Sequence, residues 1–339
     1  MGTSHPDAAI AVPPTLFISD AEVAQLTDWP SAVQALRQAY ASAIDPAMVP
    51  PRSMARGDGR WLRGLTAVSP IGGHMGCKLI SASTRHRRAS YLISLFDGAT
   101  MGLAALIDGN RVTGIRTAAT ATVAVDKAAP LQPLQVAVIG SGFEARGLLL
   151  ALAAIREIAG VQVFSPTPAS RERFANDMRT QEGLRAKAAD SASEAVRGAD
   201  VVLCAARSRD ESPVLRGEWL EPGMTVVSIG STLPEQREVD EEVLARAGLI
   251  VADMVDEVAH DTGDLIAAGK AQVDVSAKLV SLADFVAGRA QRERASDIVV
   301  YKSVGSALQD VITAEMLLAR AREKGLGTPL AHSIVPVSK

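Results

Sequence analysis

Cysteines, aromatic residues and long apolar runs are all scarce in this sequence. Only two of its 339 residues are cysteine, Cys77 and Cys204, and both have small or apolar neighbours, so we expect buried structural thiols. No cluster of Cys and His has the spacing of metal ligands, and we therefore expect no metal site. No apolar run approaches the length that spans a bilayer. These features argue against disulfide-stabilised, metal-binding and membrane-spanning proteins.

The charge balance is close to neutral. The formal net charge is −3, with 22% charged and 47% hydrophobic residues, which is ordinary for a globular protein with a core. We expect neither nucleic acid nor a membrane as a partner. Because the first residues lack a basic segment followed by an apolar stretch, we expect a leader over residues 1–14 without a signal peptide, and a cytoplasmic protein.

The first third of the chain has the pattern of mixed helices and strands. Helix signals occur at Ser19-Asp20 and over residues 29–43. Residues 52–107 consist mainly of short β-rich runs separated by turns, which predicts an α+β region with an antiparallel sheet. The clearest runs are 78–80 and 91–96, and the expected turns are Asp97-Gly98 and Asp108-Gly109.

Apolar runs and helical segments alternate after residue 135. An Ala- and Thr-rich segment over 113–129 predicts a long helix before them, and Pro130 and Pro133 mark a linker. Strands at this spacing, joined by helices, predict an α/β fold with a Rossmann-type doubly wound parallel sheet beside the α+β domain. The predicted strands are 136–139, 161–164, 201–205, 226–229 and 249–252, and the predicted helices are 144–158, 170–179, 193–197 and 303–324.

A glycine-rich turn follows the first of these strands. Residues 140–145 read Gly-Ser-Gly-Phe-Glu-Ala, the pattern G-x-G-x-x-A between a strand and a helix. Gly140 permits a tight turn, Gly142 lets a pyrophosphate approach the backbone, and Ala145 lets the helix pack close to the strand. The helix N-terminus offers free N–H groups to phosphates. The turn predicts a dinucleotide cofactor; a simple strand–helix turn is the alternative.

The end of the second strand bears on the choice between NAD and NADP. NAD-binding folds usually place an acidic residue there for the ribose 2′-hydroxyl, but this chain has Ser165-Pro166-Thr167 after Phe164. With no carboxylate to repel a 2′-phosphate, and with Arg171 and Arg173 close by, we predict NADP(H), with NAD(H) as the alternative. Both arginines could instead lie on a solvated helix face.

Six segments of the chain share the pattern of one protein family. They are Val49-Pro-Pro-Arg52, Gly76-Cys-Lys78-Leu, Gly114-Ile-Arg116-Thr117-Ala-Ala119, Ile139–Ala145 with Glu144 in place of Gln, Gly230-Ser231 with Pro234 and Arg237–Asp240, and Lys302–Asp310. Together they resemble the ornithine cyclodeaminase/mu-crystallin family over roughly residues 15 to 325. The resemblance implies a substrate-binding and dimerisation domain over 15–128, completed by 303–330, a Rossmann domain over 129–302, and a homodimer built through the N-terminal sheets.

The resemblance also implies roles for individual residues. Arg52 and Arg116 are candidates to bind a substrate carboxylate, because arginine pairs with carboxylates in a bidentate manner. Lys78 and Arg116 are the catalytic candidates; Lys78 would orient or protonate the substrate nitrogen, although a snorkelling edge-strand lysine is the alternative. The expected cofactor contacts are Arg116, Thr117, Gly140, Ser141, Gly142, Phe143, Glu144, Ala145, Ser165, Thr167, Arg171, Ala205, Ala206, Gly230, Ser231 and Ser303.

Two departures from the family pattern bear on the reaction. True cyclodeaminases carry a proton-donating aspartate two residues after the glycine that matches Gly230, but this chain has Thr232, which cannot shuttle a proton as a carboxylate can. This favours reduction of a ketimine or a cyclic imine, such as pyrroline- or piperideine-2-carboxylate, to an amino acid. The second departure is the cationic loop 84–88, which could select an acidic substrate group beside the active site or form a solvated hairpin tip.

Three other functions are kept as alternatives. They are a cyclodeaminase-type lyase with recycled NAD, an amino-acid dehydrogenase of the same family, and a non-enzymatic binding protein. The intact set of Arg52, Lys78 and Arg116 argues against the last. We expect Thr232 to contact the substrate together with these three residues. We expect no catalytic role for His74, and we expect Asp253 to be a solvated or capping carboxylate.

Overall fold

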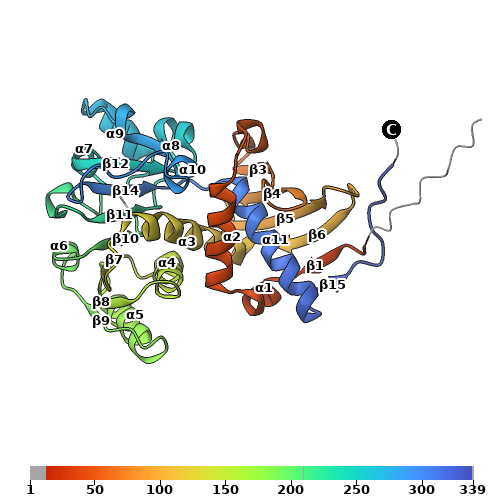
Figure 1. Cartoon of the computed structure of the whole chain (residues 1–339), viewed down its shortest axis with the longest axis horizontal. Coiled ribbons are helices and arrows are strands. Elements are labelled where there is room, and N and C mark those ends of the chain that lie inside the picture. The colour runs from red at the N-terminus through yellow and green to blue at the C-terminus, as the bar shows by residue number, and fades with distance from the viewer. Residues whose placement is uncertain (1–12, 209, 338–339) are drawn as a thin grey trace, which may run out of the picture.

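The computed structural model describes residues 13–208 and 210–337, so most of the expected leader lies outside the described residues. The chain forms two sheets on either side of the long helix α3 (Gly109–Ala128), as Figure 1 shows. Strands of the first sheet come from residues 16–108 and 328–329, and strands of the second from residues 134–302. Division of the chain into two domains at residue 129 remains a prediction that this separation supports.

The first sheet is antiparallel, as predicted, apart from one strand pair. Its order in the described chain is β15-β1-β6-β5-β4-β3-β2, and β1 runs parallel to β6. In this register Lys78 of β4 lies opposite Leu65 of β3 and Ile93 of β5. The strands are β1 (Leu16–Ile18), β2 (Ser53–Gly57), β3 (Arg60–Val68), β4 (His74–Ser83), β5 (Arg88–Asp97), β6 (Leu103–Asp108) and β15 (Thr328–Pro329).

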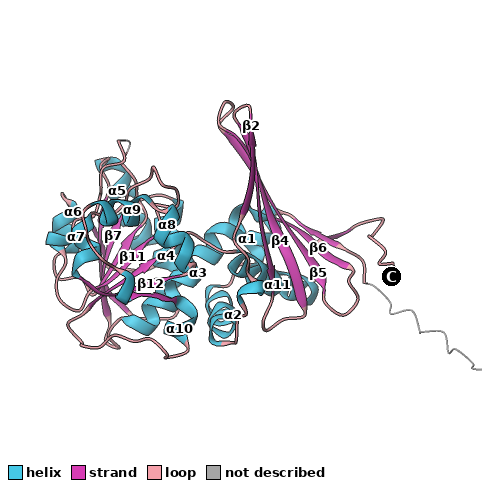
Figure 2. Ribbon diagram, turned by 90° about the horizontal axis from the view of Figure 1, so that it is seen from above, coloured by secondary structure: helices cyan, strands magenta, loops and turns pink. Residues whose placement is uncertain are grey.

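The two faces of this sheet meet different surroundings, because successive side chains point to opposite sides. On the inner face Leu65 and Ile93 are buried beneath helix α11, whereas Leu79 and Leu92 on the outer face remain 36% and 37% exposed. Figure 2 shows the helices on one side of the sheet, with none of the described helices on the other. The helical segments of this half are α1 (Asp20–Leu26), α2 (Trp29–Ala41), η1 (Pro46–Met48) and α11 (Ala307–Lys324).

The second sheet is parallel and is covered on both faces. Val136 and Val138 of its strand β7 belong to one hydrophobic cluster, whereas Ala137 and Ile139 belong chiefly to another, as in a doubly wound fold. The strand order in the described residues is β13-β12-β14-β11-β10-β7-β8-β9. The strands are β7 (Leu134–Ile139), β8 (Ile158–Phe164), β9 (Ala186–Ala188), β10 (Val201–Cys204), β11 (Thr225–Ser228), β12 (Ala247–Ala252), β13 (Leu279–Ser281) and β14 (Ile298–Lys302).

The connections of this sheet are mostly short helices. They are α4 (Phe143–Ala153), α5 (Pro168–Thr180), α6 (Ala192–Val196), η2 (Gly217–Trp219), α7 (Glu241–Arg246), α8 (Val255–Asp261), α9 (Gly263–Lys270), η3 (Ser276–Lys278) and α10 (Leu282–Val286). None of the helices described is long and apolar enough to cross a membrane.

Helix α3 confirms the predicted Ala- and Thr-rich helix but begins earlier. The side chain of Asp108 accepts a hydrogen bond from the Asn110 backbone N–H at 3.0 Å and caps the helix. The predicted turn at Asp108-Gly109 is therefore wrong, because this pair begins a helix. Small residues allow a close approach of α4, where a Cβ at Gly147 would lie 3.6 Å from that of Ala118.

Several other boundaries differ from the predictions. The helix predicted over 144–158 ends at Ala153, and Ile158 already belongs to β8. The last helix begins at Ala307 rather than Ser303, because residues 298–302 form β14 in the middle of the sheet and residues 303–306 form a loop. Cys204 is buried as expected, but Cys77 is only partly buried.

Candidate functional site

The glycine-rich turn has the geometry that a phosphate-binding site needs. Gly140 has φ +115°, and a Cβ there would lie 2.5 Å from the Ala205 carbonyl oxygen, so only glycine fits. Gly142 is the N-cap of α4, makes no side-chain cap, and has no atom within 4 Å of its ideal Cβ position. This open space beside free helix N–H groups fits a pyrophosphate. Ala145 is fully buried against the sheet, as the motif predicts.

The end of β8 gathers the residues proposed for the adenosine side of a cofactor. The Ser141 hydroxyl donates to the Ser165 hydroxyl at 3.0 Å, and Arg171 donates to the Ser165 carbonyl at 3.2 Å. The Arg171 guanidinium also lies 5.6 Å from the centre of the Phe164 ring and 3.1 Å from the Asp190 carboxylate. The sequence argument counted no carboxylate at this point, but Asp190 supplies one from the loop after β9.

Lys78 lies at the centre of a buried polar cluster on the inner face of the first sheet. Its side chain is 2% exposed, and its Nζ donates to Thr113 Oγ1 at 2.7 Å and to Asp310 Oδ1 at 3.1 Å. Burial lowers the pKa of Lys78 to about 8, against the attraction of Asp310, while nearby Arg116 lowers it further. The snorkelling alternative does not hold, because the amine points into the protein.

Arg116 joins this cluster from α3. Its Nε lies 3.3 Å from Asp310 Oδ1, and its Nη1 donates to Gln309 Oε1 at 3.0 Å. The guanidinium also lies directly over Gly305, where a Cβ would approach to 2.7 Å and where φ is +82°. The loop before α11 therefore has to carry glycine for Arg116 to reach Asp310.

Asp253 holds this loop in place. Its carboxylate accepts hydrogen bonds from the Ser303 hydroxyl at 2.6 Å and from the backbone N–H groups of Val304 and Gly305 at 3.0 and 2.8 Å. It also accepts one from Gln309 Nε2 at 2.9 Å. The expectation of a solvated or capping carboxylate is thus half right: Asp253 caps backbone N–H groups, but it is buried.

Glu144 connects the glycine-rich turn with the Lys78 cluster. Burial raises the pKa of Glu144, whereas the charges of Arg116 and Lys78 oppose the rise. Its Oε2 is buried without a hydrogen-bond partner in the described chain. The phosphate-binding turn and the cationic cluster are therefore close enough to influence one another's charge.

Arg52 already has an acidic partner. Its Nε is 3.0 Å from Glu257 Oε2 on α8, its backbone N–H donates to Glu257 Oε1 at 3.3 Å, and its Nη2 donates to the Thr232 carbonyl at 3.5 Å. Thr232 in turn donates from its hydroxyl to Gln236 Oε1 at 3.2 Å. Arg52 and Thr232 are thus neighbours in the structure, and Thr232 presents no carboxylate.

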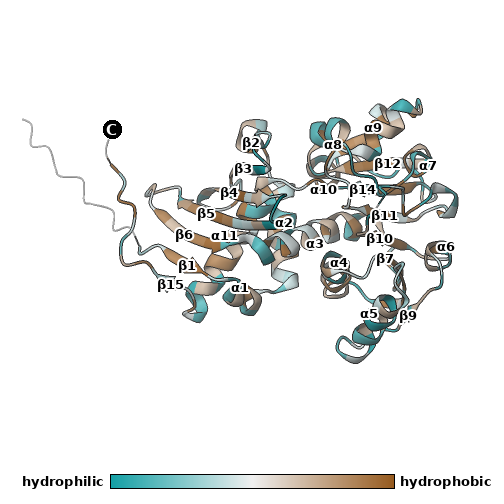
Figure 3. Cartoon of the chain, turned by 180° about the vertical axis from the view of Figure 1, so that it is seen from behind, coloured by the Kyte–Doolittle hydropathy of each residue, from teal (hydrophilic) through white to brown (hydrophobic). Residues whose placement is uncertain are grey.

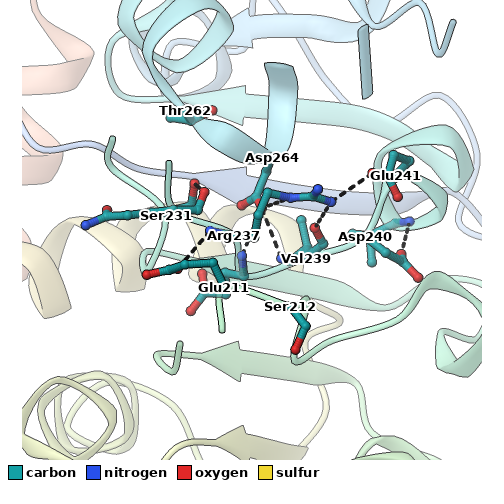
Figure 4. A network of polar contacts seen from close by, with 12 residues as sticks. Glu211, Ser212, Ser231, Arg237, Val239, Asp240, Glu241, Thr262 and Asp264 are labelled. Atoms are coloured by element: carbon teal, nitrogen blue, oxygen red, sulfur yellow. Dashed lines mark hydrogen bonds and ion pairs between the residues drawn. The ribbon is translucent and has the colours of Figure 1, made fainter. Parts of the chain in front are cut away.

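Buried acidic residues tie down the loops that follow β10 and β11. Glu238 accepts hydrogen bonds from the backbone N–H groups of Ala206 at 3.0 Å and Gly230 at 2.7 Å, both predicted cofactor contacts. Asp264 accepts from the Glu238 backbone N–H at 2.9 Å and pairs with the fully buried Lys302 at 2.9 Å. Figure 4 shows Asp264 beside Arg237, which also pairs with Glu241. Ser231 is buried and donates to the Gln236 carbonyl at 2.6 Å.

The remaining candidates lie at different places around the glycine-rich turn and the first sheet. Thr117 is buried on α3, and Ala205 continues β10, its N–H donating to the Ile139 carbonyl at 2.9 Å. Thr167 begins α5 without a side-chain cap, whereas the Phe143 ring turns toward Gly114 on α3 rather than toward the open side of the turn. His74 pairs with Glu315 at 3.1 Å, away from Lys78.

The cationic loop 84–88 is an exposed hairpin tip. β4 ends at Ser83, five residues beyond Lys78, which is about 17 Å along an extended strand. The idea that this loop lies beside the active site of its own chain is therefore wrong, and the solvated-tip alternative is confirmed.

Sequence reasoning missed the acidic and hydroxyl side chains that contact the cationic residues. Asp310, Glu257 and Thr113 contact Lys78 or Arg52 in the structure, yet each lies on a helix far away in the sequence. In the sequence Asp310 is marked only as the last residue of a family segment. No local pattern identifies these residues, because the contacts arise when α3, α8 and α11 meet the first sheet.

These features define a class of protein. A phosphate-binding turn at the carboxyl edge of a parallel sheet, beside a buried lysine–arginine–aspartate cluster, is the arrangement of a nicotinamide-dependent enzyme. Residues 49–325 match the sequence pattern of the ornithine cyclodeaminase/mu-crystallin family. The chain belongs to this family, as the resemblance indicated.

Comparison with individual proteins agrees with this membership. The chain is 31% identical over 228 residues to Delta(1)-pyrroline-2-carboxylate reductase of Bacillus cereus, covering 67% of this chain and 69% of that protein. It resembles the crystal structure of a probable ornithine cyclodeaminase from Bordetella pertussis Tohama I, with TM-score 0.81, 30% identity and coverage of 93% and 100%. A Thermococcus litoralis Delta(1)-pyrroline-2-carboxylate reductase, solved with NADH and L-proline, gives TM-score 0.84, 26% identity and coverage of 93% and 100%.

The coarse predictions are thereby confirmed. The protein is an oxidoreductase that uses a nicotinamide cofactor, and its fold is the Rossmann-type α/β fold with a second, α+β part. The substrate, the preference between the two nicotinamide dinucleotides and the roles of single residues are developed below as proposals.

Proposed function

We propose that this protein reduces the C=N bond of an imino acid, a ketimine or a cyclic imine, to the corresponding amino acid. The observation that carries the proposal is Lys78, an amine that is buried, hydrogen-bonded to Asp310 and lowered in pKa to about 8. An amine with such a pKa can hold or release a proton near neutral pH. NAD(P)H, when bound, supplies the hydride.

The two arginines suit the carboxylate of such a substrate. Arg116 uses Nε and Nη1 on Asp310 and Gln309, while its Nη2 has no hydrogen-bond partner among residues 13–208 and 210–337. Arg52, the second arginine, is held at one edge by Glu257. A carboxylate between two guanidinium groups would fix the imino carbon, and Lys78 would protonate or orient the nitrogen.

Thr232 supports reduction over cyclodeamination. Its hydroxyl is engaged with Gln236, and it offers no carboxylate to move protons. A cyclodeaminase-type reaction with recycled NAD, and an amino-acid dehydrogenase reaction, are the alternatives that the assay below distinguishes.

The test mixes the purified protein with NADPH or NADH and with pyrroline-2-carboxylate or piperideine-2-carboxylate, and follows absorbance of the reduced cofactor. We expect oxidation of the cofactor and formation of the cyclic amino acid. In parallel, ammonia release from ornithine with NAD⁺ is measured. Ammonia and proline formed without net consumption of cofactor would overturn the proposal in favour of the lyase.

We also propose a preference for NADP(H). Ser165, Thr167 and Arg171 at the end of β8 could bind a 2′-phosphate once the Arg171–Asp190 pair opens. Titration of protein fluorescence with NADPH and with NADH measures the preference. Asp190→Asn is expected to tighten NADPH binding with little effect on NADH, and a wild-type protein that binds NADH much better than NADPH would contradict this assignment.

The outer face of the first sheet supports a homodimer. Leu79 and Leu92 face each other across β4 and β5, and Leu62 on β3 is 47% exposed on the same face. Seen from behind in Figure 3, strands β1, β5 and β6 are largely hydrophobic. An exposed apolar sheet face of this kind is typical of an interface between subunits.

A further inference from the structure

Arg63 occupies a place beside Lys78 that the proposed reaction does not use. It lies on β3 opposite Ile80, and Ile80 lies opposite Tyr91 of β5. Lys78 is opposite Leu65, two residues further along β3. Arg63 and Lys78 are therefore diagonal neighbours on the inner face, which lie about 7–8 Å apart in such a register, with a somewhat shorter distance between their Cβ atoms.

The surroundings of Arg63 place its guanidinium near Arg52, Glu257 and Tyr91. Burial lowers the pKa of Arg63, and the charge of Arg52 lowers it further, while Glu257 opposes the shift. The guanidinium lies 5.3 Å from the centre of the Trp61 ring. Tyr91 acts on the pKa of Arg63 as well, and its ring is 5.7 Å from Lys78 Nζ, so it lies close to both cations.

Arg63 has no anionic partner in the described chain. Its Nε is buried without a hydrogen bond, and no described carboxylate lies within ion-pair distance. Glu257, the acidic residue that acts on Arg63, is engaged by Arg52 at 3.0 Å. Asp310 is engaged by Lys78 and Arg116.

An unpaired cation in such a place is costly unless something compensates it. A partly buried guanidinium loses hydration, and a second arginine nearby adds repulsion. The Trp61 ring recovers only a part of this cost. Such a residue is a candidate for binding an anionic ligand, which would supply the missing negative charge.

We propose that Arg63 binds a second carboxylate of the substrate, and that the substrate is therefore an imine of a 2-oxo dicarboxylic acid. This inference rests on the proposed imine reduction and specifies its substrate class. The hydride adds to the imino carbon and one proton to the nitrogen, giving CH–NH and the oxidised cofactor, while the second carboxylate stays unchanged. Arg63 thus selects the side chain, whereas Arg52 and Arg116 hold the α-carboxylate.

The test compares imines that differ in the second carboxylate. Methylamine is mixed with pyruvate, oxaloacetate or 2-oxoglutarate, and kcat/KM is measured with NADPH for the wild type, Arg63→Ala and Arg63→Lys. We expect the wild type to prefer a dicarboxylate by at least about tenfold. Arg63→Ala is expected to lose roughly 10- to 100-fold on the dicarboxylate, the range of a charge-assisted contact, and less than about threefold on the pyruvate imine.

Arg60→Ala serves as the matched control. Arg60 lies on the same strand, and its partner is the exposed Asp58 at the hairpin tip. This variant should behave as the wild type with every substrate, and Arg63→Lys should recover part of the dicarboxylate preference. Equal losses on both substrate classes in Arg63→Ala, or a wild type that prefers the pyruvate imine, would overturn the inference.

A binding measurement separates this inference from the proposed function. L-Aspartate, L-glutamate and L-alanine are titrated against the protein with oxidised cofactor present, and the shift in melting temperature is recorded. If no imine is reduced, the proposed function fails. A larger shift with the acidic amino acids in the wild type, lost in Arg63→Ala, would still support Arg63 as a carboxylate site, and no difference between the amino acids would refute it.

Discussion

At the scale of single residues, charge in this protein is controlled by burial. Lys78, Arg116 and Asp310 form a cluster in which two cations share one carboxylate, so a positive charge remains. Burial disfavours that net positive charge, and loss of the lysine proton is the change that removes it at the lowest cost in free energy. The pKa of Lys78 therefore falls to about 8, and Lys78, rather than either arginine, becomes the group that exchanges protons near neutral pH.

Lys78→Met should reduce kcat/KM for imine reduction by at least about 100-fold, the range typical of lost general acid catalysis. In the wild type kcat/KM should fall as the pH rises through about 8, because the donor form of Lys78 disappears. The pH profile and the Kd for NADPH check this. Lys127→Met, at an exposed lysine of α3, should leave both unchanged. Full turnover in Lys78→Met would remove Lys78 from the mechanism.

Glu144→Gln should make cofactor binding independent of pH. Burial raises the pKa of Glu144, so in the wild type the carboxyl ionises only as the pH climbs above its usual range. The resulting negative charge at the start of α4 would repel a pyrophosphate bound there. The Kd for NADPH of the wild type should therefore increase between pH 5 and pH 7.

Fluorescence titration over this range measures the effect in both proteins. Glu172→Gln, at an exposed glutamate of α5, should keep the wild-type pH dependence. A wild-type Kd that does not change with pH, or the same slope in Glu144→Gln, would show that Glu144 does not face the phosphates.

At the scale of elements, the strand–turn–helix unit β7–α4 contains two glycines with different roles. We expect one to serve the stability of the fold and the other, two residues later, to serve ligand binding. Gly140 adopts a positive φ and presses against the Ala205 carbonyl, so it serves the fold. Gly142 faces open space at the start of α4, so we expect it to serve the ligand. The motif thus has glycine at both positions, but for two different physical reasons.

Substitution of the two glycines should separate these roles. Gly140→Ala is expected to destabilise the protein by about 1–3 kcal/mol, because it strains the backbone. Gly142→Val should leave the melting temperature nearly unchanged and weaken NADPH binding by roughly tenfold or more. Thermal unfolding and cofactor titration of both variants provide the check. Unchanged NADPH affinity in Gly142→Val would place the phosphates elsewhere.

At the scale of the whole molecule, the two faces of the first sheet differ in their burial. The inner face is covered by α11, which returns from the far end of the chain, and it carries Lys78 and Arg63. The outer face, which none of the described helices covers (Figure 2), exposes leucines on several strands. A second copy of the chain can cover the outer face without blocking the site on the inner one.

Leu79→Arg should convert the proposed dimer into a monomer. A charge in the middle of the apolar face would be buried without a partner in the assembly. Light scattering coupled to size exclusion should give twice 35.4 kDa for the wild type and 35.4 kDa for the variant. Leu131→Arg, at a linker leucine that is 94% exposed, is the control and should remain dimeric. A wild-type monomer would contradict the proposed assembly.

The sequence by itself determined the parts of this protein that depend on neighbouring residues. The turn 140–145, the alternating strands and the long helix α3 were predictable, because hydrophobic periodicity and glycine placement act over a few residues. The family segments placed Arg52, Lys78 and Arg116 at one site, and the structure brings Lys78 and Arg116 onto the same carboxylate.

Only the tertiary structure decided the electrostatics and the selectivity of the site. Asp310 and Glu257 reach the cations from helices more than 200 residues away in sequence, and these contacts decide which charge remains unpaired. The register of β3 against β4 places Arg63 beside Lys78 and the cationic loop 84–88 far from it. Strand register and helix docking arise from packing of the whole chain. The cation that we propose to select an acidic substrate group is therefore Arg63, and not an arginine of the conspicuous loop 84–88.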